Sequence, residues 1–136
     1  MFISAFCLIL GLAIYTFLRH GTYYHEFLPQ GIRAYFSNIS NSVPDNFITD
    51  FIRFWFVDFL WGVSLTFALI SVLTEATKKK LISAACVSFA AGVVYELCQL
   101  FSLVSGTFDI LDVAMYAAAS FVCAAVSINL FLRRTI

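Results

Sequence analysis

Long apolar runs alternate with short polar segments along the chain, and this pattern predicts helices that cross a membrane. About twenty apolar residues are needed to span the hydrocarbon core as a helix. Four stretches approach or exceed this length, roughly Phe2 to Leu18, Phe51 to Leu73, Leu81 to Leu103 and Ile110 to Leu132. The runs are continuous and do not alternate with period two, which favours helices over the strands of a membrane barrel. We therefore predict an all-α integral membrane fold.

Composition agrees with this prediction. Of the 136 residues, 62% are hydrophobic and only 12% are charged, which is far outside the range of a soluble globular domain. Two prolines and six glycines leave little room for a linker, so we expect one domain over residues 1–136. The eight basic and eight acidic residues balance, and no basic stripe occurs. We therefore expect no nucleic-acid partner.

The basic residues predict the orientation, because Lys and Arg concentrate in cytoplasmic loops. Three of them lie between the second and third stretches, and two follow the fourth: Lys78, Lys79, Lys80, Arg133 and Arg134. With four spans, the N-terminus and the C-terminus would both face the cytoplasm. The first stretch has no preceding Lys or Arg and no small-residue cleavage pattern after it, so we expect an uncleaved helix. The simplest topology is an up-down four-helix bundle.

The long outer loop, from Arg19 to Asp50, has the aromatic content of a segment in the headgroup layer. Its aromatic residues include Tyr23, Tyr24, Phe27, Tyr35 and Phe36. We predict a short interfacial helix near Gly31 to Ser37. A helix start is predicted at Ser42 or Val43, because the following Pro44 and Asp45 suit a first helical turn.

Cysteine and histidine positions give no sign of a disulfide framework or a zinc site. The four cysteines fall inside apolar stretches, and neither a CxxC motif nor a Cys/His ligand spacing occurs: Cys7, Cys86, Cys98 and Cys123, with His20 and His25 in the outer loop. We interpret the cysteines as packing residues and expect no cofactor.

Several polar residues inside the spans fall at one depth. An ionisable group at a helix centre costs about 3 kcal/mol, so each needs a reason to be there. Asp58 lies about two turns into the second helix from its outer end, and Glu96 about two turns into the third from the same side. Gln99 is one turn nearer the surface, and Asp109 and Asp112 open the fourth helix.

Helical spacing groups these residues into stripes, which we expect to face inward because lipid cannot solvate them. One stripe holds Ser88, Gly92, Glu96 and Gln99, a second holds Asp109, Asp112, Tyr116 and Ser120, and a third holds Asp50, Phe54, Asp58 and Trp61. The prediction is a polar pocket that opens outward. Its candidate ligand-binding residues are Asp58, Trp61, Glu96, Gln99, Asp109, Asp112 and Tyr116.

The same residues have a structural interpretation, as interhelical hydrogen bonds worth about 1 kcal/mol each. For Gln99 or Tyr116 alone this interpretation is favoured. For the whole set it is not, because the acids outnumber the one nearby cation, Arg53, and crowded carboxylates in a low dielectric cannot all stay ionised without a partner. Either some are protonated, or a cationic ligand or metal ion joins them.

Two ligand hypotheses follow. Carboxylate oxygens suit magnesium or calcium, so a metal site would use Asp58, Glu96 and Asp112. Arg53 is expected either to pair with Asp50 on its own helix or to contact the phosphate of a lipid headgroup.

Short motifs in a fixed order resemble those of the VanZ-like family. They are Asp58–Trp61 with Ser64–Leu65, then Glu96–Gln99, then Gly106–Asp112, and the resemblance covers roughly Pro44 to the C-terminus. The family consists of small bacterial integral membrane proteins, and its naming member is associated with teicoplanin resistance. The resemblance implies a multi-pass protein of the bacterial cell membrane. It matches Asp58, Trp61, Glu96, Gln99, Asp109 and Asp112, and departs at Tyr116, Ala119 and Cys123, where members often have asparagine and glycines.

Three functions compete at this point. The first is an outward-facing acidic pocket that recognises an envelope component (a glycopeptide, a lipid headgroup or a lipid-linked precursor), with a contribution to glycopeptide resistance. The second is a membrane enzyme that acts on a lipid headgroup with a divalent cation. The third is an accessory subunit that packs against a protein partner or a second copy. The chain has no nucleophile motif and no phosphate-binding glycine loop, which favours the first hypothesis over the second.

Overall fold

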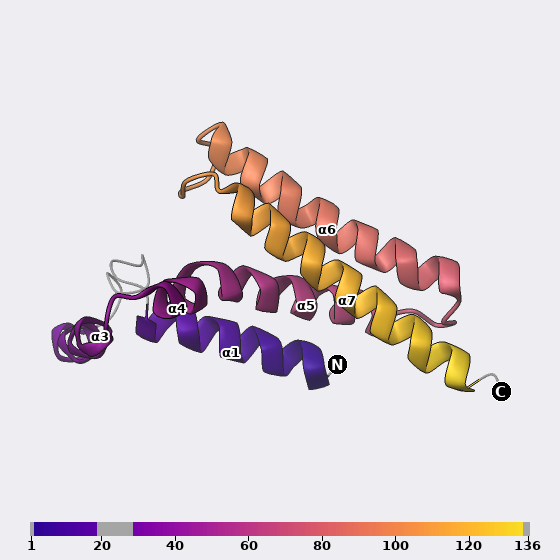
Figure 1. Ribbon diagram of the computed structural model, residues 1–136, viewed down its shortest axis with the longest axis horizontal. Helices are drawn as coiled ribbons and strands as arrows, with labels where there is room; N and C mark the ends of the chain where they lie inside the picture. Colours follow the sequence, from indigo (N-terminus) through magenta and orange to yellow (C-terminus); the bar gives the residue numbers. More distant parts are fainter. Residues whose placement is uncertain (1, 19–28, 135–136) are drawn as a thin grey trace.

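The computed structural model describes residues 2–18 and 29–134, and the side chains as far as residue 130. All of its regular elements are helices, and no strand occurs within these residues (Figure 1). The elements are α1 (Phe2–Leu18), α3 (Gln30–Ser42), α4 (Phe47–Asp50), η1 (Phe51–Trp55), α5 (Phe56–Ser71), α6 (Lys78–Leu100) and α7 (Ile110–Arg134). The all-α prediction is confirmed. Tyr23, Tyr24, Phe27 and both histidines lie outside the described residues.

Three helices are long and apolar enough to cross a membrane: Phe47–Ser71, Lys78–Leu100 and Ile110–Leu130. The first of them joins α4, η1 and α5 into one continuous rod. α1 is a shorter apolar helix of 17 residues, or about 26 Å at 1.5 Å per residue, against a hydrocarbon core of about 30 Å.

Capping residues explain where two of these helices begin, a few residues before the predicted apolar stretches in both cases. The Asn46 side chain accepts a hydrogen bond from the backbone N–H of Thr49 at 3.0 Å, and the Thr77 hydroxyl accepts one from Lys80 at 3.3 Å. Each satisfies a donor of the first helical turn. The predicted helix start at Ser42 or Val43 is therefore wrong, because Asn46 is the residue that caps the helix.

The helices pack in a simple order. α1 packs against α5, and α5, α6 and α7 pack against one another. Figure 1 shows consecutive long helices running in opposite directions, with the N-terminal end of α1 and the C-terminal end of α7 at the same end of the molecule. We call this the terminal end. The opposite end, which carries α3 and the loop between α6 and α7, is the α3 end.

A small apolar core lies where α1, α5 and α7 meet. It is formed by Cys7, Leu60, Val63, Ala119 and Cys123. Cys7 and Cys123 are buried free thiols that act as packing residues, as predicted, whereas Cys86 is exposed and Cys98 is half-buried, so the packing interpretation is wrong for Cys86. Large apolar side chains on the outer faces are exposed, for example Phe121 at 76%. Such an outer surface suits lipid contact.

The helix α3 lies across the direction of the others, and Figure 1 views it end-on beside the ends of α1 and α4. Two contacts attach it to α1. The Phe36 ring meets the Phe17 ring edge-on at 4.8 Å between centroids, and the Ser40 hydroxyl donates to the Leu18 carbonyl at 3.1 Å. The helix predicted near Gly31 to Ser37 is thus present and extends from Gln30 to Ser42.

Candidate functional site

Tyr116 of α7 is enclosed by two glycines from the neighbouring helices. A Cβ atom on Gly92 of α6 would lie 2.7 Å from Tyr116 Cδ2, and one on Gly62 of α5 would lie 3.3 Å from Cδ1. At Gly92 only a residue without a side chain leaves room for the ring, and at Gly62 a Cβ would be in tight contact with the ring and would lie 2.8 Å from the Ala119 Cβ. The ring is 7% exposed, so it fills the space where α5, α6 and α7 meet.

Three carboxylic acids lie one helical turn nearer the α3 end than this ring. Asp58 precedes Gly62 by four residues on α5, Glu96 follows Gly92 by four residues on α6, and Asp112 precedes Tyr116 by four residues on α7. Because α6 runs opposite to α5 and α7, these offsets all point the same way. Asp58, Glu96 and Asp112 therefore form one level, which we call the acid layer.

Contacts with Tyr116 support this placement. The Tyr116 hydroxyl donates a hydrogen bond to Asp58 Oδ1 at 3.1 Å, which joins α7 to α5. The charges of Asp58, Glu96 and Asp112 all lie near enough to act on that hydroxyl. The structure thus brings together four of the residues selected from the sequence.

Glu96 is the most buried member of the acid layer, at 1% exposure, whereas Asp58 and Asp112 are half-buried. Its Oε2 accepts a hydrogen bond from the backbone N–H of Asp109 at 3.2 Å. This contact holds the α6–α7 loop over the acid layer. A buried carboxylate is strongly destabilising without donors, so the position of the loop matters to Glu96.

Asp109 connects three parts of the chain. Its Oδ1 accepts from the backbone N–H of Leu111 at 2.9 Å, which caps the first turn of α7, and its Oδ2 accepts from the Trp55 indole N–H at 3.0 Å. Trp55 is not among the candidates predicted from the sequence. The signal was present, since Trp55 stands three residues before Asp58, a spacing that puts both on one helix face.

Two further candidates lie away from the acid layer. Trp61 packs against α1, where a Cβ on Gly11 would lie 2.7 Å from its Nε1 and the Tyr15 ring is 6.0 Å away between centroids. Gln99 packs under Gly106 in the α6–α7 loop, where a Cβ on Gly106 would lie 2.7 Å from Gln99 Cδ, and the φ of +138° at Gly106 favours glycine. The sequence predicted that Gln99 lies one turn beyond Glu96, but it did not predict the neighbours of Trp61 or Gln99.

A π-helical turn changes the face that Asp50 and Phe54 present. In η1 the backbone N–H of Phe56 bonds to the carbonyl of Phe51, which inserts an extra residue into the helix. The predicted stripe of Asp50, Phe54, Asp58 and Trp61 therefore does not hold, because the residues before the turn are rotated relative to those after it. Asp58 contacts Tyr116 instead, and Phe54 is 38% exposed.

Arg53, inside η1, is 4% exposed and pairs with two acids through one nitrogen. Its Nη1 lies 3.1 Å from Asp45 Oδ1 and 3.9 Å from Asp50 Oδ1. The predicted pairing with Asp50 is present, and the Asp45 contact is shorter. Nε and Nη2 of Arg53 are buried and find no hydrogen-bond acceptor among the residues that the structure describes.

Below the Tyr116 ring, toward the terminal end, polar groups hold helices together. The Gly62 carbonyl accepts hydrogen bonds from the hydroxyls of Thr66 at 2.8 Å and Ser88 at 3.3 Å, and the latter joins α6 to α5. The Ser64 hydroxyl donates to the Ser4 carbonyl at 2.9 Å, which joins α5 to α1. Hydrogen bonding within and between helices is therefore sufficient to explain these polar residues.

The acid layer can accept hydrogen bonds from hydroxyl, amide or ammonium donors at the α3 end. Within residues 2–18 and 29–134, no group of three or more His, Cys, Asp and Glu side chains has the geometry to hold a metal ion. The divalent-cation hypothesis for Asp58, Glu96 and Asp112 therefore has no geometric support. Comparisons with family models, with curated proteins and with solved structures found no match to the chain.

Proposed function

We propose that the chain is a VanZ-like protein of the bacterial cell membrane whose acid layer recognises a component of the cell envelope. The ligand classes are a glycopeptide, a lipid headgroup or a lipid-linked wall precursor, all of which carry hydroxyl, amide or ammonium donors. The order of the motifs from Asp58 to Asp112 supports the family. Its glycopeptide association supports resistance as the cellular setting.

One observation carries the proposal: three helices of alternating direction each contribute a carboxyl group at the same level, around one buried tyrosine. Acids within a membrane span are costly and mark functional sites more often than scattered surface acids do. Packing alone does not require them, because Gly62 and Gly92 already seat the Tyr116 ring by shape. Asp58 and Asp112 are half-buried and therefore within reach of a ligand at the α3 end.

The proposal includes four membrane spans with both termini in the cytoplasm. α1 is long enough to cross if the bilayer thins slightly around it. Lys78 to Lys80 begin α6 at the terminal end, where cytoplasmic positive charge is expected. A C-terminal fluorescent-protein fusion should be fluorescent in a bacterial host, and an alkaline phosphatase fusion at the same site should be inactive. The reverse result would place the acid layer on the cytoplasmic side.

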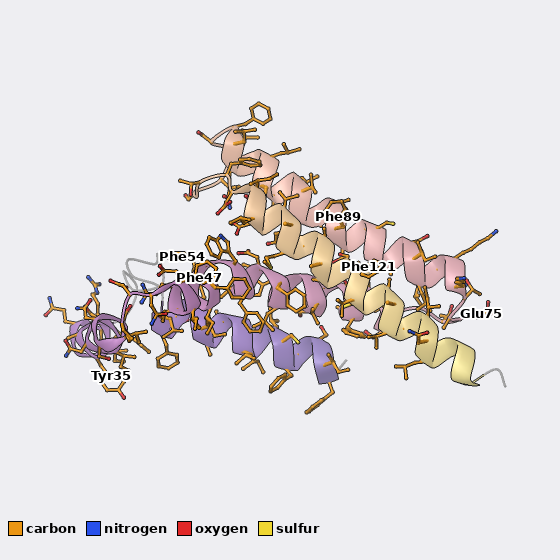
Figure 2. The ribbon with its side chains drawn as sticks, in the orientation of Figure 1. Tyr35, Phe47, Phe54, Glu75, Phe89 and Phe121 are labelled. Carbon is orange, nitrogen blue, oxygen red and sulfur yellow. The ribbon has the colours of Figure 1, made fainter. Side chains whose placement is uncertain are left out.

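Asp58→Asn and Glu96→Gln test the function itself, because each removes a charge and keeps the shape of the side chain. The matched control is Glu75→Gln, since Glu75 is an exposed acid at the terminal end whose side chain contacts Lys80 at 3.6 Å. Figure 2 shows Glu75 at the opposite end of the molecule from Phe47 and Phe54. The readout is the inhibitory concentration of teicoplanin for a bacterium that expresses each variant at equal membrane level.

We expect the wild type and Glu75→Gln to raise the inhibitory concentration, and Asp58→Asn and Glu96→Gln to lose most of that effect. Equal protection by all four proteins would reject a role for the acid layer. Equal susceptibility with and without the wild-type chain would reject a glycopeptide role.

A further inference from the structure

The guanidinium group of Arg53 has one complete edge without a partner. Both acids that it pairs with, Asp45 and Asp50, meet Nη1. The other two nitrogens, Nε and Nη2, form the side-on edge of the group, where two N–H bonds point in parallel. Throughout the described residues neither nitrogen finds an acceptor, and both are buried.

Such an edge fits one class of ligand. Two parallel N–H donors match two oxygens of one carboxylate or phosphate group, the bidentate geometry that distinguishes arginine from lysine. A buried donor without an acceptor is destabilising by about 1–3 kcal/mol, and more when it is charged. An oxyanion at this edge would satisfy both donors at once.

The surroundings of Arg53 favour a lipid as the source of that oxyanion. Its partner Asp45 is 82% exposed, so the guanidinium lies directly beneath the surface at the α3 end. Phe47 and Ile48, six and five residues before Arg53 on the same continuous helix, are 75% and 70% exposed. Figure 2 shows Phe47 and Phe54 at this end of the molecule. Exposed apolar side chains at the same end as a buried cation suit the boundary between acyl chains and headgroups.

We propose that the Nε–Nη2 edge of Arg53 binds the phosphate of a membrane phospholipid. This site shares no residue with the acid layer, so its test is independent of the envelope-recognition proposal. Asp45 does not occupy this edge, because it contacts Nη1, but its negative charge repels a phosphate placed there. Removing its charge should therefore strengthen phosphate binding.

The test uses the purified full chain in dodecyl maltoside. Thermal unfolding is followed by tryptophan fluorescence while one of three probes is added: dioleoylphosphatidylglycerol, a galactolipid with the same acyl chains and no phosphate, or inorganic phosphate. A ligand that binds only the folded protein raises Tm in a concentration-dependent way. We expect the phosphatidylglycerol to raise Tm and the galactolipid and inorganic phosphate to leave it nearly unchanged.

Arg53→Lys keeps the positive charge and removes the bidentate Nε–Nη2 donor pair. The apparent Kd of this variant for phosphatidylglycerol should therefore be higher by about tenfold or more. Asp45→Asn should bind at least as tightly as the wild type. The matched control is Arg33→Gln on α3, where an exposed arginine is removed, and it should bind like the wild type.

Three results would overturn the proposal. One is equal stabilisation of the wild type by the galactolipid and by phosphatidylglycerol. Another is unchanged affinity in Arg53→Lys. The third is stabilisation by inorganic phosphate equal to that by the lipid, which would assign the edge to a free anion. The lipid comparison needs only the wild-type chain, so the test holds even if an Arg53 variant fails to fold.

Discussion

Gly92→Ala tests the packing that sets the level of the acid layer. The added methyl group would lie 2.7 Å and 2.8 Å from Cδ2 and Cδ1 of Tyr116, closer than carbon atoms approach without displacement. The ring has little freedom to move, since Gly62 confines it from α5 and its hydroxyl is bonded to Asp58. α6 and α7 must therefore separate, or the hydrogen bond must break.

The magnitude follows from three effects. Overpacking a filled site costs about 1–3 kcal/mol. Loss of the Tyr116–Asp58 hydrogen bond adds about 0.6 kcal/mol, the average for such bonds between membrane helices. Alanine in place of glycine favours the helix by about 1 kcal/mol. The balance is a loss of about 0.6–2.6 kcal/mol in the free energy of unfolding, so the clash outweighs the gain in helix propensity.

The assay is unfolding of the purified protein by sodium dodecyl sulfate in mixed micelles, followed by circular dichroism. Gly31→Ala is the matched control, because a Cβ at Gly31 would have no neighbour within 4 Å, and it should be at least as stable as the wild type. In a Tyr116→Ala background the cost of Gly92→Ala should largely vanish. Wild-type stability of Gly92→Ala, or an equal cost in both backgrounds, would refute the proposed fit between glycine and ring.

Two further predictions concern the polar contacts of the site. Tyr116→Phe should lower stability by about 1 kcal/mol, and a double-mutant cycle with Asp58→Asn should show coupling of about 0.6–1.7 kcal/mol; additive effects would mean that the two side chains do not interact. Trp55→Phe removes the donor to Asp109 Oδ2 and should speed hydrogen exchange in the α6–α7 loop, while exchange in α1 stays unchanged. Unchanged exchange in that loop would show that the indole does not hold it.

The sequence predicted the helical class and the shared level of the acids because both depend on chain-local quantities. Apolar run length gives the helices, and a rise of 1.5 Å per residue puts Asp58 and Glu96 at one level. Their distances from the helix ends differ from the predicted two turns, because the first long helix begins at Phe47, eleven residues before Asp58, and α6 ends at Leu100, four residues after Glu96. The direction in which the Trp61 side chain points was less predictable. It depends on which helix becomes its neighbour, and here that helix is α1 with its glycine at position 11.

Other features could not be predicted because they arise from competing local interactions. The π-turn at Phe51–Trp55 rotates Asp50 away from the line of Asp58, and no residue in that segment marks it in the sequence. The helix start was misplaced for a similar reason. Pro44 and Asp45 have the properties of a first turn, but the Asn46 side chain reaches the Thr49 N–H and begins the helix there.

Tyr116 packs between two glycines, so the residues that position the helices differ from the residues that would bind a ligand. The axial register of α5, α6 and α7 is set by the shape of one ring against Gly62 and Gly92, and the carboxyl groups occupy the neighbouring turn. Amide side chains introduced at Asp58 or Glu96 keep an oxygen that can accept from the Tyr116 hydroxyl or the Asp109 N–H, and should thus leave the backbone in place. Ligand preference in such a protein can change through the acids alone, while the glycines and the aromatic ring stay fixed.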